Sequence, residues 1–240
     1  MEKGLKLTIF SLLLIIILLL AGCNESSTDK VLSESDKVEI KKLFSGMDGK
    51  VELLLFTSQL GCYSCSKTET LMREIDGLSD KISLKIYDKE KNEQIAAKYN
   101  IELVPAVVIV GKENYGIKQY GFPGGREIMP FLEAIKNSSM QKPILSEEIS
   151  KKIDTMDSPV EIKIFITSTC PYCPDMVRGA NYYALASDKV STVTIMSNEF
   201  DEYSKKYKVN SVPTIIFNEK VKREGQMSEE AFVNYLVTSS

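Results

Sequence analysis

The sequence of 240 residues contains no histidine. This absence excludes catalytic triads and general bases built on imidazole, and it excludes histidine as a metal ligand. Charge of one sign is also lacking, because 30 Lys and Arg stand against 33 Asp and Glu, for a net charge of −3. Nucleic-acid binding would want a basic surface, so no nucleic-acid partner is expected. Any nucleophile in this chain must be activated by its local electrostatic field.

Cysteine is scarce as well, with five residues in the whole chain. Four of them form two C-x-x-C motifs, one at Cys62 and Cys65 and the other at Cys170 and Cys173. The fifth is Cys23. No thiol is therefore left over once the two motifs and Cys23 have each been given a role.

Each motif lies between an apolar run and an amphipathic stretch. The runs are residues 51–57 (VELLLFT) and 160–166 (VEIKIFI), and they predict buried strands. The residues after each motif repeat with helical periodicity. A strand, a turn and a helix that begins at the first cysteine is an arrangement that suits a redox dithiol, because a helix N-terminus favours the thiolate.

We therefore predict that Cys62 and Cys170 are attacking thiols, and that Cys65 and Cys173 are resolving thiols. The alternative is a structural zinc site. Cys65 and Cys170 are 105 positions apart, which is far beyond the spacing in a zinc ribbon. The strand-to-helix context favours redox dithiols over metal ligands.

The chain contains an internal repeat. Cys62 and Cys170 are 108 positions apart. Three further pairs keep this offset: Cys65 and Cys173, Tyr99 and Tyr207, Pro105 and Pro213. A constant offset over several landmarks predicts two similar domains. The breaker-rich residues 137–143 (NSSMQKP) mark the boundary, so the domains are expected at 32–140 and 141–240.

The N-terminal segment has the features of a targeting sequence. Lys3 and Lys6 precede an apolar stretch over residues 7–21. The stretch ends Leu-Ala-Gly-Cys at residues 20–23, which resembles the lipobox of bacterial lipoproteins. The resemblance implies a signal peptide at 1–22, an acylated Cys23, a flexible tether at 23–31, and domains anchored to the membrane outside the cytoplasm. An uncleaved N-terminal anchor is the alternative, with the same orientation.

Each repeat is predicted to contain a helix followed by β-α-β-α-β-β-α, with a mixed four-stranded sheet. Ser33 is expected to cap the first helix, with Asp36 as its capping-box partner. The cysteine helices are expected at 62–78 and 170–187. The fold class is therefore α/β, with two tandem domains.

This order, with C-x-x-C after the first strand, resembles the thioredoxin fold. Val104-Pro105 and Val212-Pro213 each stand just before a strand, and each proline is 40 positions after the second cysteine of its motif. In thioredoxin-like proteins that proline is cis and its loop faces the dithiol. The resemblance implies that Val104 and Val212 pair through their backbones with an extended substrate, beside Pro105 and Pro213.

Two such units in one chain resemble the glutaredoxin-like protein disulfide oxidoreductases, here in a lipoprotein version. Cys-Pro-Tyr-Cys at 170–173 is the glutaredoxin-type motif, whereas Cys-Tyr-Ser-Cys at 62–65 is not a standard redox sequence. Phe56 and Ile164 occupy the positions of the buried carboxylate of thioredoxin. Glu52 and Glu161 are possible substitutes, although solvated charges at the strand ends are the favoured interpretation.

These observations predict an extracytoplasmic, membrane-anchored thiol–disulfide oxidoreductase that acts on protein disulfides and needs no cofactor. Its partners would be protein thiols or disulfides and an electron donor or acceptor protein. One alternative is a dedicated electron donor to a single acceptor, such as a peroxidase or an apocytochrome. Another is a non-catalytic lipoprotein that binds a soft metal. Pro171 and Pro174 rigidify the second motif, so the second dithiol is expected to be the stronger catalyst.

Overall fold

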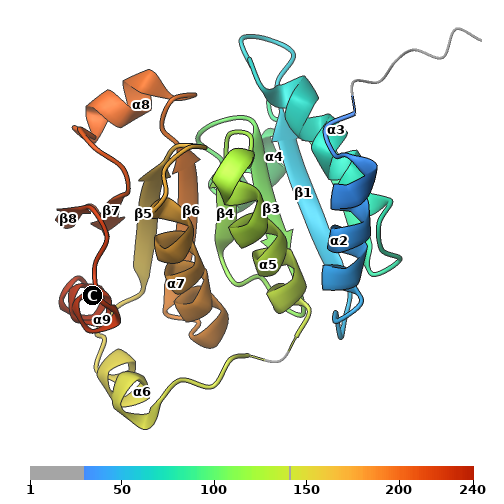
Figure 1. Cartoon of the computed structure of the whole chain (residues 1–240). Helices are drawn as coiled ribbons and strands as arrows, with labels where there is room; N and C mark the ends of the chain where they lie inside the picture. Colours follow the sequence, from blue (N-terminus) through green and yellow to red (C-terminus); the bar gives the residue numbers. More distant parts are fainter. Residues whose placement is uncertain (1–29, 141) are drawn as a thin grey trace, which may run out of the picture. The chain divides into compact units, whose positions relative to one another are not determined.

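One sheet of eight strands organises the chain, in the order β2-β1-β3-β4-β6-β5-β7-β8 (Figure 1). This computed structural model describes residues 30–140 and 142–240. The strands are β1 (Val51–Thr57), β2 (Ile82–Asp88), β3 (Ala106–Val110), β4 (Ile117–Tyr120), β5 (Val160–Ile166), β6 (Val190–Met196), β7 (Thr214–Phe217) and β8 (Val221–Glu224). The predicted signal peptide and Cys23 lie outside the described residues.

The sheet consists of two halves with the same topology. In the first, β1 pairs in parallel with β2 and antiparallel with β3, and β4 pairs antiparallel with β3. In the second, β5 pairs in parallel with β6 and antiparallel with β7, and β8 pairs antiparallel with β7. The predicted fold of two thioredoxin-like repeats is confirmed.

The two four-stranded sheets are continuous with each other. Strand β4 pairs in parallel with β6, with Ile117 opposite Thr192 and Tyr120 opposite Ile195. Residues 31–240 form one compact unit. Since β1 is antiparallel to β3 and β3 is antiparallel to β4, β1 runs in the same direction as β4, β6 and β5. The C-terminal ends of β1 and β5 therefore lie at the same edge of the sheet.

Eight helices and a short 3₁₀ helix connect the strands of the described chain. The helices are α2 (Glu34–Phe44), α3 (Cys65–Asp76), α4 (Glu93–Lys98), α5 (Ile128–Ser138), α6 (Glu147–Asp154), α7 (Cys173–Ala186), α8 (Asp201–Lys206) and α9 (Glu229–Thr238), with η1 (Gly125–Glu127) directly before α5. The predicted capping box is confirmed, because the Asp36 N–H donates to Ser33 Oγ and the Ser33 N–H donates to Asp36 Oδ2. No helix in the described chain is long and apolar enough to cross a lipid bilayer.

The two faces of the sheet have separate apolar cores. Leu53 and Leu55 of β1 belong to the core that includes residues of α2, α3, α5, α7 and α9. Leu54 and Phe56 point the other way, into the core with Ala96 of α4. This alternation follows from the two-residue repeat of a strand, and burial on both faces explains why β1 is almost entirely apolar.

The predicted starts of the two cysteine helices are wrong. The helices begin at the second cysteine of each motif, Cys65 and Cys173, rather than at Cys62 and Cys170. The residues directly before them, Ser64 and Tyr172, take the N-cap positions. The turn after each strand therefore includes the first cysteine, which precedes the helix.

Candidate functional site

The two C-x-x-C motifs lie at the same edge of the sheet. One follows β1 and opens α3, and the other follows β5 and opens α7. Cys62 is bonded to Cys65, and Cys170 to Cys173, with a Cα–Cα distance of 5.5 Å in each pair. A disulfide that closes so short a loop can open and close without rearrangement of the sheet. Each pair can therefore exchange two electrons with another dithiol or disulfide.

The second dithiol is the more enclosed of the two. Cys170 is 5% exposed and Cys173 is fully buried. The backbone N–H of Cys173 donates a hydrogen bond to Cys170 Sγ at 3.2 Å. This donor belongs to the first turn of α7, so it adds to the helix dipole in favouring a thiolate at Cys170 after reduction.

The first dithiol is arranged differently. Cys62 is half-buried and Cys65 is 6% exposed, while Tyr63 between them is fully exposed. No backbone N–H in the described chain donates to the sulfur of Cys62. The hydroxyl of Ser64 instead donates to the carboxylate of Glu199, which belongs to the second repeat. The loop of the first dithiol is therefore attached to the other half of the molecule.

The cis-proline prediction is confirmed, because the Val104–Pro105 and Val212–Pro213 peptide bonds are both cis. The prolines directly precede β3 and β7, which neighbour β1 and β5 in the sheet. Within the described residues, the backbone N–H and C=O groups of Val104 and Val212 form no hydrogen bond. Free backbone groups at the dithiol edge are available to an extended peptide, as β-augmentation requires. The assignment of these four residues to substrate binding stays a prediction.

Glu52 and Glu161 do not contact the dithiols. They lie near the starts of β1 and β5, at the opposite edge of the sheet. Glu52 forms an ion pair with Lys85 at 2.5 Å, and Glu161 forms one with Lys163 at 2.8 Å. About a third of each glutamate side chain is exposed, so the interpretation as solvated strand-end charges is correct.

Glu127 is a buried carboxyl that the sequence analysis missed. It is 1% exposed, and neither of its oxygens has a hydrogen-bond partner within the described chain. Burial raises the pKa of Glu127 to about 7, although the nearby charge of Arg178 opposes the shift. A small cavity beside Glu127 is also lined by Val177, which lies one turn after Cys173 on α7. A carboxyl that ionises near neutral pH beneath this helix can take up or release a proton while the second dithiol reacts.

The position of Glu127 depends on the turn between β4 and α5. The backbone N–H of Arg126 donates to the carbonyl oxygen of Ser168, two residues before Cys170, at 2.9 Å. Gly125 has φ +63°, and a Cβ there would lie 2.4 Å from that same oxygen. Glycine is therefore required where the first repeat meets the loop of the second dithiol. The Gly-Gly pair at 124–125 indicated a turn in the sequence, but nothing indicated that the next acidic side chain would be buried.

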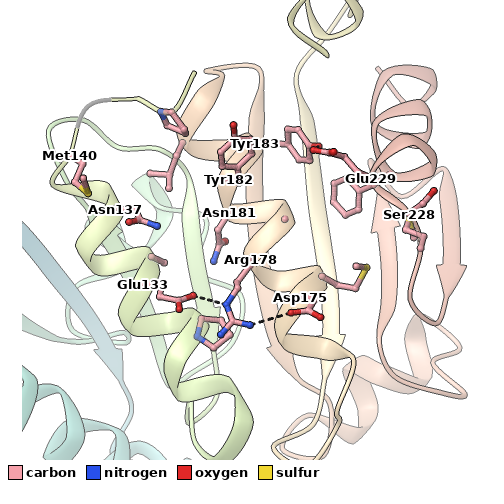
Figure 2. A pocket seen from close by; sticks show the side chains of 18 residues that line it. Glu133, Asn137, Met140, Asp175, Arg178, Asn181, Tyr182, Tyr183, Ser228 and Glu229 are labelled. Carbon is pink, nitrogen blue, oxygen red and sulfur yellow. Dashed lines mark hydrogen bonds and ion pairs between the residues drawn. The ribbon is translucent and has the colours of Figure 1, made fainter. Parts of the chain in front are cut away.

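A cavity of about 670 Å³ extends along α7, between α5 and α9 (Figure 2). Figure 2 shows Arg178 of α7 between Glu133 of α5 and Asp175 of its own helix. The distances are 2.6 Å from Arg178 Nε to Glu133 and 3.3 Å from Arg178 Nη1 to Asp175. This ion pair joins the two repeats next to the first turn of α7, where Cys173 lies.

Metal binding has no counterpart in this geometry. Among residues 30–140 and 142–240, no group of three or more cysteine, aspartate or glutamate side chains is placed to hold a metal ion.

Two thioredoxin-like repeats, each with a C-x-x-C disulfide beside a cis-proline loop, define a tandem thiol–disulfide oxidoreductase. Comparison with known proteins agrees. The family model described as thioredoxin domain matches residues 50–116 and 160–238, which together are more than half of the chain. The protein belongs to this thioredoxin domain family.

Solved structures and curated relatives indicate the same arrangement. A protein disulfide oxidoreductase from Aeropyrum pernix has a TM-score of 0.77 and 26% identity, over 88% of this chain and 95% of that one. The NTD_N/C domain of the alkylhydroperoxide reductase AhpF from Enterococcus faecalis has a TM-score of 0.77 and 25% identity, over 85% and 99%. The alkyl hydroperoxide reductase AhpF of Staphylococcus aureus is 26% identical over 207 residues, which are 86% of this chain and 38% of that protein. The chain thus spans well under half the length of that relative.

Proposed function

We propose that this oxidoreductase acts outside the cytoplasm on disulfides of other proteins, anchored to the membrane by a lipid on Cys23. The observation that carries the catalytic part is the pair of disulfides at one sheet edge, each beside a cis-proline loop with free backbone groups. The anchor is supported by the lipobox-like residues 20–23 at the end of the apolar run. A single acyl chain binds membranes only marginally, so stable attachment needs the two chains of a diacylglyceryl group or more.

Substrate reduction follows from the geometry of the second dithiol. The Cys170 thiolate attacks one sulfur of the substrate disulfide, and the other substrate sulfur leaves as a thiolate that takes a proton from water. Cys173 then loses its proton and attacks Cys170 Sγ. The Cys170–Cys173 disulfide forms, and the second substrate sulfur leaves and is protonated. Two electrons have passed to the substrate, and the reverse sequence oxidises a substrate dithiol.

Insulin reduction tests the catalytic part. With dithiothreitol as the source of electrons, the full-length chain should accelerate the precipitation of reduced insulin. A variant with all four motif cysteines replaced by serine should precipitate insulin at the rate of dithiothreitol alone. Equal rates for the two proteins would refute an activity on protein disulfides.

Mass spectrometry tests the anchor. In a bacterial host that modifies lipoproteins, the mature chain should begin at a diacylglyceryl-modified Cys23 and partition into the membrane fraction. Cys23→Ser should remain unprocessed after Gly22. An unmodified Cys23 in the mature protein would overturn the anchoring proposal and leave the redox proposal intact.

A dedicated electron donor is the second candidate function. Its support is the similarity to the alkyl hydroperoxide reductase AhpF over most of this chain. The test mixes the reduced chain with a thiol peroxidase and an alkyl hydroperoxide, and follows dithiol oxidation by alkylation. Oxidation in one rapid turnover, together with negligible insulin reduction, would favour the dedicated donor over the broad oxidoreductase.

A further inference from the structure

The first dithiol is in contact with a carboxylate from the other repeat. Ser64 is the third residue of the Cys62–Cys65 motif and is 7% exposed. Its hydroxyl donates to Glu199 Oε2, although the two residues are 135 positions apart. Ser64 also occupies the N-cap of α3, but its side chain makes no capping hydrogen bond. The hydroxyl that would ordinarily cap this helix is directed to the second repeat instead.

The structure holds the Glu199 carboxylate in place from a second side. The backbone N–H of Phe122 donates to Oε1 at 3.0 Å and to Oε2 at 3.3 Å. Gly121 before it has φ +85°, and a Cβ there would lie 2.6 Å from Met196 Cβ and 3.0 Å from Glu199 Oε2. Only glycine leaves room for this carboxylate, so Glu199 lies in a site that the backbone shapes around it.

A fixed negative charge at this place opposes a thiolate on the first dithiol. When the disulfide is reduced, the thiolate of Cys62 forms in the turn before α3, where the helix dipole favours it. The Glu199 carboxylate, bound to the adjacent Ser64, lies close enough to repel that second negative charge. Lys67 opposes this effect, since its ammonium lies 4.2 Å from the centre of the Phe122 ring. Lys67 is solvent-exposed, so its charge is screened more strongly than that of the half-buried Glu199.

We propose that Glu199 is a positioning residue of the second repeat that, through Ser64, makes the first dithiol more reducing than the second. This inference rests on the proposed function, because it assumes that Cys62 and Cys65 exchange with other thiols. The second motif has no equivalent contact. Tyr172 occupies the position of Ser64 and is 57% exposed, and the donor at Cys170 favours the thiolate there. The two dithiols thus differ in the sign of their electrostatic surroundings, so electrons should pass from the first dithiol towards the second.

Separate redox titration of the two dithiols tests the inference. The full-length chain is equilibrated without oxygen in mixtures of reduced and oxidised glutathione, where two glutathione thiols become one disulfide as one protein disulfide becomes a dithiol. Free thiols are then alkylated, and peptide mass spectrometry quantifies each motif. The variants are Glu199→Gln and Ser64→Ala. Glu202→Gln is the matched control, because Glu202 lies three residues further on, is 89% exposed and pairs with Lys205.

Glu199→Gln should raise the equilibrium constant for reduction of Cys62–Cys65 by about tenfold, as expected for removal of one nearby charge. Ser64→Ala should change the constant in the same direction but by less, because the charge remains. Alkylation of Cys62 by iodoacetamide at pH 7 should be faster in Glu199→Gln, since more of the thiol is ionised. The constant for Cys170–Cys173 should stay unchanged in both variants, and Glu202→Gln should match the wild type.

Two results would overturn the inference. One is a Glu199→Gln constant equal to that of Glu202→Gln. The other is an equal change at both dithiols, which would indicate a general loosening of the junction between the repeats. Failure of the proposed function looks different, because the wild-type disulfides would then fail to exchange with glutathione and insulin at all.

Discussion

The backbone N–H of Cys173 lies 3.2 Å from the sulfur of Cys170 and donates a hydrogen bond to it. Cys170 thus has a donor already in place for the negative charge that develops on reduction. Among the described residues, Cys62 has no corresponding donor, and its loop is held by a carboxylate instead. The two motifs have the same spacing and the same Cα–Cα distance, yet their electrostatic surroundings differ.

The first prediction ranks the two dithiols. Cys170→Ser should remove most of the insulin reduction with dithiothreitol, whereas Cys62→Ser should retain most of it. The reason is the better-stabilised thiolate at Cys170, together with the turn that Pro171 and Pro174 rigidify. Initial rates of insulin precipitation at equal protein concentration provide the measurement.

The control for this ranking is Ser66→Ala, an exposed change next to the first motif that leaves all four thiols in place. Equal losses in Cys62→Ser and Cys170→Ser would mean that the two dithiols work as an obligatory relay. A larger loss in Cys62→Ser would reverse the ranking.

Much of the fold could be predicted because its signals are local. Strand β5 has the predicted limits, since a continuous apolar run follows Pro159 and ends where polar residues begin. The capping box at Ser33 and Asp36 needs only three residues of spacing to be recognised. The internal repeat extended these local signals to the whole chain, because each element of one half supported its counterpart in the other.

The parts that could not be predicted depend on contacts between the halves. Nothing near Glu127 in the sequence indicates burial, because α7 that covers it begins 46 residues later. The bond from Ser64 to Glu199 joins residues 135 positions apart, and no pattern in either segment refers to the other. The continuity of the sheet likewise arises from the pairing of β4 with β6, which are edge strands in their separate halves.

The second prediction compares two glycines at which an added methyl group has opposite effects. A Cβ at Gly111 would lie 1.9 Å from the carbonyl oxygen of Ser138 at the end of α5, so Gly111→Ala must displace that helix. A Cβ at Gly179 in α7 meets no atom within 4 Å. We expect Gly111→Ala to lower the free energy of unfolding by about 2–4 kcal/mol, and Gly179→Ala to raise it by about 0.5–1 kcal/mol.

Urea unfolding followed by circular dichroism measures both glycine variants. The two changes add the same atoms, so each serves as the control for the other. A stable Gly111→Ala protein would mean that the junction of β3 and α5 is looser than the structure indicates.

The third prediction concerns the ion pair between the repeats. Arg178→Ala removes the bonds to Glu133 and Asp175, and it should lower the free energy of unfolding by about 1 kcal/mol or less, because these side chains are partly exposed. The loss should shrink in 1 M salt, where the Debye length is about 3 Å. Arg73→Ala is the control, since Arg73 pairs with Glu69 within α3 alone. A salt-independent loss would indicate that the packing of the Arg178 side chain matters more than its charge.

The last prediction concerns pH and Glu127. Its pKa is about 7 in the folded protein, above the ordinary value of 4.5, because burial disfavours the charged form. The folded protein therefore holds this proton more tightly than the unfolded chain does. The resulting stabilisation is complete below about pH 4.5 and is lost as the pH rises towards about 7. Glu127→Gln stays neutral throughout, so it should exceed the wild type in stability at pH 8 by on the order of 2–3 kcal/mol, and match it near pH 5.

Urea unfolding of both proteins between pH 5 and pH 8 measures this difference, with Glu39→Gln on the exposed face of α2 as the control. Parallel stability curves for wild type and Glu127→Gln would show that the carboxyl is hydrated or paired in solution. The same carboxyl lies under α7, whose first residue is Cys173. The rate of insulin reduction should therefore show an inflection near pH 7 that Glu127→Gln removes, while Glu39→Gln keeps it. An inflection unchanged in Glu127→Gln would assign it to the thiols alone and confine Glu127 to stability.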